Sequence, residues 1–177
     1  MPIVRQIAQL GHPVLRQVAA KIIDPSTPAL QALMDDMQVT VADANGVGLA
    51  APQVYESCRL IIIASRPNAR YPHAPEMEPT IMINPELLHA CDEREYGWEG
   101  CLSIPGMRGL VPRYRKIGVR YQTRDGDNRE VAYEGFLARV FQHEFDHLEG
   151  MLYVDRLESM LDLVTEKEYA RILQEMR

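Results

Sequence analysis

The sequence of 177 residues is poor in cysteine and has no long apolar run. Its three cysteines are an odd number without framework spacing, which argues against a disulfide scaffold and fits a reducing compartment. No apolar stretch approaches the roughly 20 residues that a membrane-spanning helix needs. The first residues, Met1–Arg5, lack the apolar stretch of a signal peptide. We therefore expect a cytoplasmic protein that does not enter membranes.

An excess of positive charge is also missing, because the net charge is −6 and the pI is about 5.4. This balance argues against non-specific binding to nucleic acids or anionic membranes, and we predict no direct specific nucleic-acid binding. Internal repeats and low-complexity segments are absent as well. The length predicts one domain over residues 1–177, large enough to bury a core.

The most informative segment that is present is His143-Glu144-Phe145-Asp146-His147. Two histidines four positions apart share one face of a helix, and the glutamate after the first lies near whatever the imidazoles bind. The alternative is two buried histidines satisfied by backbone carbonyls. Burying two histidines and a carboxylate on one helix without partners is costly, so we favour a hydrolytic metal site.

The apolar spacing predicts a helix from Phe136 to Leu148 around this segment. Both histidines and Glu144 then project from its apolar face, which should pack against the core. Arg139, Gln142 and Asp146 fall on the opposite side, and we expect Arg139 to face solvent.

A third metal ligand is available about forty residues upstream, in Glu99-Gly100-Cys101-Leu102-Ser103. Cysteine with two histidines holds a divalent metal and leaves the fourth position open for water. Cys101 can instead be a buried free thiol, or a nucleophile that uses His143 as its base. The nucleophile hypothesis leaves the glutamate and the second histidine of the helix without a role.

Another segment, Gly46-Val47-Gly48-Leu49-Ala50-Ala51-Pro52-Gln53, contains two glycines that allow the backbone to approach a ligand closely. A tight turn after the preceding helix explains these glycines as well, and no Lys-Ser/Thr pair follows to make a phosphate loop. The Gln53 amide can donate to an oxygen with developing charge, or can be an ordinary loop side chain.

The remaining pattern indicates short strands around a few helices, which is an α+β fold with short mixed or antiparallel strands packed around the central HExxH helix. Further helices are expected at Pro13–Lys21, from Ser26 or Thr27 to Asn45-Gly46, and from about Ser159 onward. Strands are expected at Arg59–Ser65, Thr80–Leu87, Lys116–Thr123 and Arg129–Tyr133, with a proline-rich loop at Pro67–Pro79. The C-terminal helix, with Met160, Leu163, Val164, Ile172 and Leu173, is expected to pack on the body and to be the least essential segment.

The three motifs together resemble the peptide deformylases, which carry GxGLAAxQ, EGCLS and QHExDH in this order. Residues 46–53, 99–103 and 142–147 match these motifs without a gap, and the resemblance covers most of the chain. Ile83-Asn84-Pro85 and Ile104-Pro105-Gly106 also look like the family. The resemblance implies a metallohydrolase of linear amides that removes the N-formyl group from the formyl-methionine of newly synthesised polypeptides and releases formate.

The implied metal ligands are Cys101, His143 and His147. A divalent metal there lowers the pKa of its bound water towards ~7. That water attacks the formyl carbon, with Glu144 as general base and then as general acid. The family commonly uses Fe²⁺ in the cell and also works with nickel or cobalt, while zinc forms are often weak; the ligand set itself suits zinc equally well.

The resemblance also implies that Gln53 and the backbone N–H of Leu102 stabilise the oxyanion. Carboxylates that could orient the ligand histidines are Glu99 and Asp146, although both can be solvated charges. The expected partner is a nascent formyl-methionyl polypeptide, and the enzyme is expected to be a monomer. Docking of the enzyme on the ribosome near the exit tunnel is a further option.

The methionine side chain requires an apolar pocket, and Val47, Leu137 and Val140 are candidate walls, with core packing as the alternative. The substrate backbone is expected to lie beside Gly46, Val47 and Gly48 as an added strand.

Two other functions are alternatives to the deformylase hypothesis. A zinc endoprotease of the HExxH class would take a downstream third ligand, such as Glu149, Glu158 or Glu166, and would leave Cys101 idle. A non-catalytic binding module would be favoured if Glu144 or Gln53 were missing, and both are present.

Overall fold

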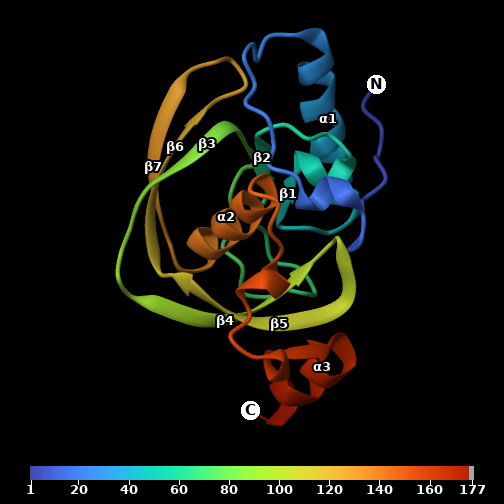
Figure 1. Cartoon of the computed structure of the whole chain (residues 1–177), viewed down its shortest axis with the longest axis vertical. Coiled ribbons are helices and arrows are strands. Elements are labelled where there is room, and N and C mark those ends of the chain that lie inside the picture. The colour runs from blue at the N-terminus through green and yellow to red at the C-terminus, as the bar shows by residue number, and fades with distance from the viewer. Residues whose placement is uncertain (176–177) are drawn as a thin grey trace.

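The computed structural model describes residues 1–175, so the last two residues of the expected domain, 176–177, lie outside the described residues. Helix α2 (Gly135–Leu148) runs through the centre of the molecule, and strands curve around it (Figure 1). Helix α1 (Pro28–Asp43) lies to one side, and α3 (Glu166–Glu175) projects at the C-terminal end. This arrangement confirms the α+β class with a central motif-bearing helix.

Two antiparallel sheets surround α2. The larger sheet has the order β1-β2-β3-β6-β7, and the smaller one has the order β4-β5-β8. The larger sheet comprises β1 (Gly48–Ala50), β2 (Leu60–Ile63), β3 (Thr80–Ala90), β6 (Lys116–Gln122) and β7 (Asn128–Glu134). The smaller sheet comprises β4 (Arg94–Cys101), β5 (Ile104–Tyr114) and β8 (Leu163–Thr165). Short 3-10 helices are η1 (Pro13–Arg16), η2 (Ala51–Val54), η3 (Tyr153–Arg156) and η4 (Met160–Asp162).

Strand β2 separates two parts of the core, because alternate residues of a strand point to opposite faces. Ile61 and Ile63 belong to the cluster around Phe141 of α2, whereas Leu60 and Ile62 belong to the cluster around Met37 of α1. A strand buried on both faces reads as a continuous apolar run, which is why this segment was predictable. Its burial holds α2 and the segment around β1 at fixed positions.

Two predicted elements differ from the structure. The helix expected at Pro13–Lys21 is only the 3-10 turn η1, after which Val18 and Ala20 form isolated bridges to Glu149 and Cys58. The C-terminal helix begins at Glu166, not near Ser159, because the preceding residues pair with β5 as strand β8. Met160, Leu163 and Val164 are therefore not on that helix.

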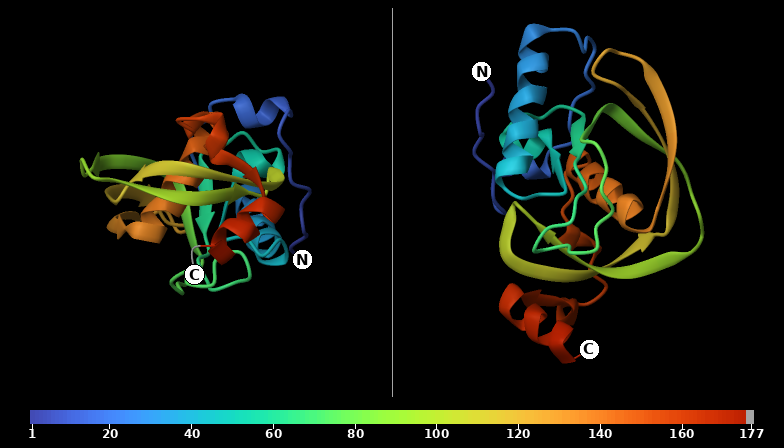
Figure 2. Two further views of the ribbon diagram at one scale, coloured as in Figure 1. Left: turned by 90° about the horizontal axis from the view of Figure 1, so that it is seen from below. Right: turned by 180° about the vertical axis from the view of Figure 1, so that it is seen from behind.

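Strands β4 and β5 were missed, because their sequences are rich in charged residues, glycine and proline. Pro112 is accommodated because β5 pairs with β8 only over Met107–Gly109, so this part of the strand has a single neighbour. Two further views show the hairpin of β4 and β5 passing between the body and α3 (Figure 2). No helix within residues 1–175 is both long enough and apolar enough to cross a bilayer.

Candidate metal centre and active site

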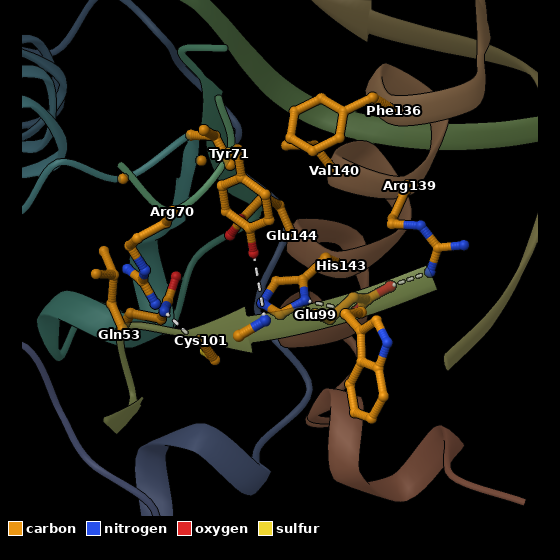
Figure 3. Close-up of a pocket in the computed structure, with 16 residues that line it drawn as sticks. Gln53, Arg70, Tyr71, Glu99, Cys101, Phe136, Arg139, Val140, His143 and Glu144 are labelled. Carbon is orange, nitrogen blue, oxygen red and sulfur yellow. Dashed lines mark hydrogen bonds and ion pairs between the residues drawn. The ribbon is translucent and has the colours of Figure 1, made fainter. Parts of the chain in front are cut away.

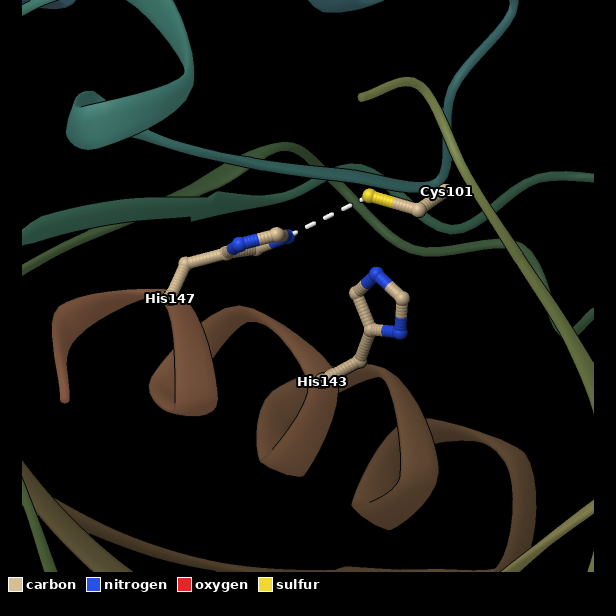
Figure 4. Close-up of side chains that lie close together, drawn as sticks. All are labelled: Cys101, His143 and His147. Carbon is tan, nitrogen blue, oxygen red and sulfur yellow. Dashed lines mark hydrogen bonds between the residues drawn. The ribbon is translucent and has the colours of Figure 1, made fainter. Parts of the chain in front are cut away.

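The end of β4 and two turns of α2 bring three buried donor side chains together (Figure 4). The ligand atoms of Cys101, His143 and His147 all lie within 4.8 Å of one another. Cys101 Sγ is 3.4 Å from His147 Nε2. The register of β4 shifts between Glu99 and Cys101, which allows both side chains to reach α2. The group expected from the sequence is therefore present as a metal-binding cluster.

The donor set fits a divalent transition metal. Glu99 Oε2 lies 2.9 Å from His143 Nδ1, which fixes the ring and leaves Nε2 for a metal. Burial and the neighbouring His143 lower the pKa of His147 well below its usual value, so this ring is a neutral ligand. Glu144 Oε2 is buried without a hydrogen-bond partner, and such an atom calls for a bound species beside it.

Two arginines hold the Glu99 carboxylate, and neither contact could be predicted from the sequence. Arg113 binds it through Nε at 2.9 Å and Nη2 at 3.0 Å, and Arg139 Nη1 binds it at 2.9 Å. Burial opposes ionisation, but Arg113 and the bond with His143 outweigh it and hold the pKa of Glu99 well below its usual range. The carboxylate beside the metal cluster is therefore charged at neutral pH.

The polar face predicted for α2 is buried, so the expectation that Arg139 faces solvent is wrong. Its side chain is 12 % exposed and reaches Glu99 and the carbonyl of Val111. Gln142 bonds the backbone of Tyr114 at 2.9 Å and 3.1 Å. The physical reason is the β4–β5 sheet, which covers this face of the helix and supplies polar partners.

Asp146 was a candidate for orienting a ligand histidine. Its contacts are with arginines instead: Arg113 Nη1 at 2.6 Å and Arg156 Nη2 at 2.7 Å. Because Arg113 also binds Glu99, Asp146 helps to hold Glu99 in place through Arg113.

Glu144 lies against the backbone of β1. A methyl group at Gly48 would overlap the Glu144 carboxylate, so the second glycine of the motif is required by space. Burial raises the pKa of Glu144 to about 7; nearby His143 opposes this and Glu99 adds to it. This pKa lies close to neutrality, as suits a group that both accepts and donates a proton.

Gln53 is buried at the start of the same region. Its Oε1 accepts a hydrogen bond from the Ala50 N–H at 2.9 Å, which orients the amide. Its Nε2 is 3.2 Å from Ser103 Oγ and 3.5 Å from Cys101 Sγ. The amide donor is therefore aimed at the metal cluster.

A pocket opens onto this cluster (Figure 3). Its lining includes expected residues: Gly46, Val47, Gly48, Gln53, Leu102 and Val140. Leu137 is not in the lining; Phe136, one position earlier, takes that place. Helical spacing gives the reason, since Phe136, Val140 and His143 lie on one stripe of α2.

Three further lining residues were not anticipated: Arg70, Tyr71 and Trp98. Trp98 is the only tryptophan in the chain and precedes the Glu99-Gly100-Cys101 motif, so its position was a usable signal. No pattern in the Pro67–Pro79 loop distinguishes Arg70 and Tyr71 from ordinary loop residues.

Comparison with known proteins decides between the candidate functions. A sequence model described as polypeptide deformylase matches residues 4–162, which is most of the chain. The chain belongs to the polypeptide deformylase family. Deformylase relatives include peptide deformylase 2 of Nostoc sp., 56% identical over 94% of this chain and 93% of the relative. Peptide deformylase 1 of Bordetella pertussis is 50% identical over 89% of each chain.

Solved structures of deformylases also match. The class I type b peptide deformylase of Acinetobacter baumannii with Met-Ala-Ser bound has a TM-score of 0.86 and 46% identity. The match covers 89% of this chain and 100% of that one. The deformylase of Synechococcus elongatus in complex with actinonin has a TM-score of 0.80 and 37% identity, over 89% and 81% of the two chains.

Proposed function

We propose that this chain hydrolyses the N-formyl group of the N-terminal formyl-methionine of newly synthesised polypeptides and releases formate. The observation that carries the proposal is the buried cluster of Cys101, His143 and His147 beside the Glu144 carboxylate, at the base of a pocket. Its family membership supports the reaction. The relative with Met-Ala-Ser bound supports a methionine-first peptide as the occupant of the pocket.

Cys101, His143 and His147 are the proposed ligands of one divalent metal, Fe²⁺ in the cell, with zinc, nickel or cobalt in preparations. A metal held by these three side chains would lower the pKa of a bound water and would supply the nucleophile near neutral pH. A thiolate ligand beside Fe²⁺ makes the centre sensitive to oxygen and peroxide. Glu99 holds the His143 ring in the ligating orientation through Nδ1.

Glu144 is the proposed general base and acid. Its carboxylate borders the pocket and lies next to the ligand His143 in the chain. It accepts the proton of the attacking water and then gives it to the leaving amine. The close packing against Gly48 keeps the carboxylate from turning away.

Gln53 and the backbone N–H of Leu102 are the proposed donors to the oxyanion, and both residues line the pocket. The bond from Ala50 to Gln53 Oε1 supports this role, because it directs the amide N–H groups towards the cluster. Each such donor contributes on the order of 3 kcal/mol to transition-state stabilisation.

The methionine side chain is proposed to pack against Val47 and Val140, with Phe136 in place of Leu137 as the further wall. The peptide backbone runs beside Gly46 and Gly48 as an added strand. We further propose a monomeric, cytoplasmic enzyme with one catalytic domain, which meets its substrates as they leave the ribosome.

The test is formate release from formyl-Met-Ala-Ser by Fe²⁺-loaded protein handled without oxygen. Wild type should turn over, and Glu144→Gln should lose at least about 1,000-fold in kcat while retaining metal. Glu134→Gln is the matched control, because Glu134 is an exposed residue at the start of the same helix and makes only surface ion pairs. No turnover by fully metallated wild type would refute the proposal.

The protease alternative is tested by Cys101→Ser. Our ligand assignment predicts a loss of metal binding, since an alcohol is a far poorer ligand than a thiolate. An HExxH protease with a downstream carboxylate ligand would keep its metal. Metal content after dialysis separates the two.

A further inference from the structure

The C-terminal helix α3 lies beyond residues 4–162, the part of the chain that the family model matches. None of its own residues is buried. Two of its side chains nevertheless reach residues that line the substrate pocket. The same two side chains, Glu166 and Tyr169, also contact Arg108 in β5.

Arg108 is 3 % exposed, so its guanidinium charge requires partners. Glu166 Oε1 of α3 lies 3.4 Å from Arg108 Nε and 3.9 Å from Arg70 Nη2. An ion pair between exposed side chains contributes little to stability. This pair is different, because leaving the buried Arg108 guanidinium without a partner would be costly. Strand β8 places α3 here, because Val164 pairs with Arg108 in register.

Two aromatic rings lie close to the Arg108 guanidinium. Its Cζ lies 5.2 Å from the ring centre of Tyr71 and 5.4 Å from that of Tyr169 of α3. Arg108 Nη1 donates to the Tyr71 hydroxyl at 3.1 Å, and so does the Gly100 N–H at 3.3 Å. A side chain at Gly100 would collide with this guanidinium. The motif glycine therefore leaves room for Arg108 as well as for the backbone.

Tyr169 makes a second contact with the pocket wall. Its ring centre lies 5.3 Å from that of Trp98. Arg70, Tyr71 and Trp98 all line the pocket, and Figure 3 shows Arg70 and Tyr71 among the side chains around it. One turn of α3 thus contacts two of these residues directly and holds the third through Arg108.

We propose that Glu166 and Tyr169 are positioning residues that hold the outer wall of the substrate pocket, with Arg108 as the link to Tyr71. The inference rests on the proposed deformylase function for its kinetic consequence. The contacts of Glu166 and Tyr169 are with Arg70, Trp98 and Arg108 rather than with Glu144 or the metal cluster. Removing them should therefore weaken peptide binding and leave the chemical step intact. We therefore expect a higher KM and an unchanged kcat.

The test compares metal-loaded wild type with Glu166→Gln, Tyr169→Leu and Tyr169→Phe on formyl-Met-Ala-Ser. Glu166→Gln and Tyr169→Leu should each raise KM about fivefold with kcat within about twofold. Tyr169→Phe keeps the ring face and should match wild type. The control is Glu168→Gln, on the same helix, which loses only the exposed pair with Arg171. Unchanged KM in Glu166→Gln and Tyr169→Leu overturns the proposal, as does a fall in kcat at unchanged KM.

Trp98, the single tryptophan, provides a readout that does not require turnover. Tyr169→Leu should shift its fluorescence emission to the red as the wall opens to water, whereas Glu168→Gln should not. Identical spectra for wild type and Tyr169→Leu contradict the proposal even if the enzyme is active. A red shift in a protein that does not deformylate supports the positioning role and refutes the proposed function alone.

Discussion

Glu99 receives hydrogen bonds from Arg113 and Arg139 and binds the His143 ring, so one buried carboxylate faces two guanidinium groups and an imidazole. Two permanent charges keep it ionised, and an ionised carboxylate increases the ligand strength of the imidazole it holds. This pairing explains why a fully buried carboxylate is tolerated next to the metal cluster.

Replacing Glu99 by Gln should lower metal affinity about 10- to 100-fold, because the amide orients the His143 ring less well and does not balance the arginines. Competition with a chromophoric chelator measures the change. Glu95→Gln, an exposed position on the same strand, should leave affinity at the wild-type value. Equal affinities for Glu99→Gln and wild type would show that Glu99 has no role in holding the ligand.

Individual residues differed in how far the sequence predicted them. The cluster of Cys101, His143 and His147 follows from helical spacing and ligand chemistry, so it was predictable. Arg113 and Tyr71 were not, because their importance comes only from packing against distant strands and loops. The burial of Arg139 could not be predicted from a helical wheel, since the wheel does not show that a second sheet covers the polar side.

At the scale of elements, α1 is tied to the N-terminal segment through Asp36. The Ile3 N–H donates to Asp36 Oδ1 at 2.8 Å, and Arg5 Nε donates to Oδ2 at 3.0 Å. The Ile3 hydrogen bond and the Arg5 charge lower the pKa of Asp36 despite its burial. The ionised carboxylate therefore stabilises the folded chain above the pKa it has when unfolded.

This stabilisation should disappear as pH falls through the lowered folded-state pKa of Asp36. Asp36→Asn should cost roughly 2 kcal/mol in free energy of unfolding at pH 7, and the difference from wild type should shrink as pH falls below the ordinary aspartate pKa and through the lowered folded-state pKa. Urea unfolding at a series of pH values measures it. Asp35→Asn, whose partner Arg124 is exposed, should change stability far less. A pH-independent difference would contradict the assignment.

Helices and strands with a regular hydrophobic period could be predicted from the sequence. Elements that are stabilised by contacts with distant segments could not. The run Leu60–Ile63 and the hairpin of β6 and β7 follow from local sequence. The hairpin of β4 and β5 does not, because glycine, proline and charged residues interrupt both strands and because ion pairs with α2 help to hold them. The start of α3 was misplaced, since pairing with β5 converts Leu163–Thr165 into a strand.

At the scale of the whole molecule, the metal cluster joins the β4–β5 sheet to the central helix. A ligand that binds only the folded chain stabilises it by RT ln(1 + [L]/Kd), which is about 2.7 kcal/mol at 100 times Kd. For a chain of this size we expect metal removal by a chelator to lower Tm by about 5–10 °C. Differential scanning calorimetry tests this.

Cys101→Ser is the control for that measurement, because it should show the lower Tm with or without added metal. If the Tm of the wild-type protein changes neither with chelator nor with added metal, the cluster does not bind metal in the folded state.

The distance along the chain between the metal ligands has a consequence for biosynthesis. Cys101 precedes His147 by 46 residues, so a chain that has not yet been synthesised as far as α2 holds only one of the two walls of the site. Because an unfolded chain rarely contains a preformed metal site, loading must follow completion of α2 and its docking on β4. The ions that are free in the cell when the chain finishes folding are therefore the first that can occupy the site.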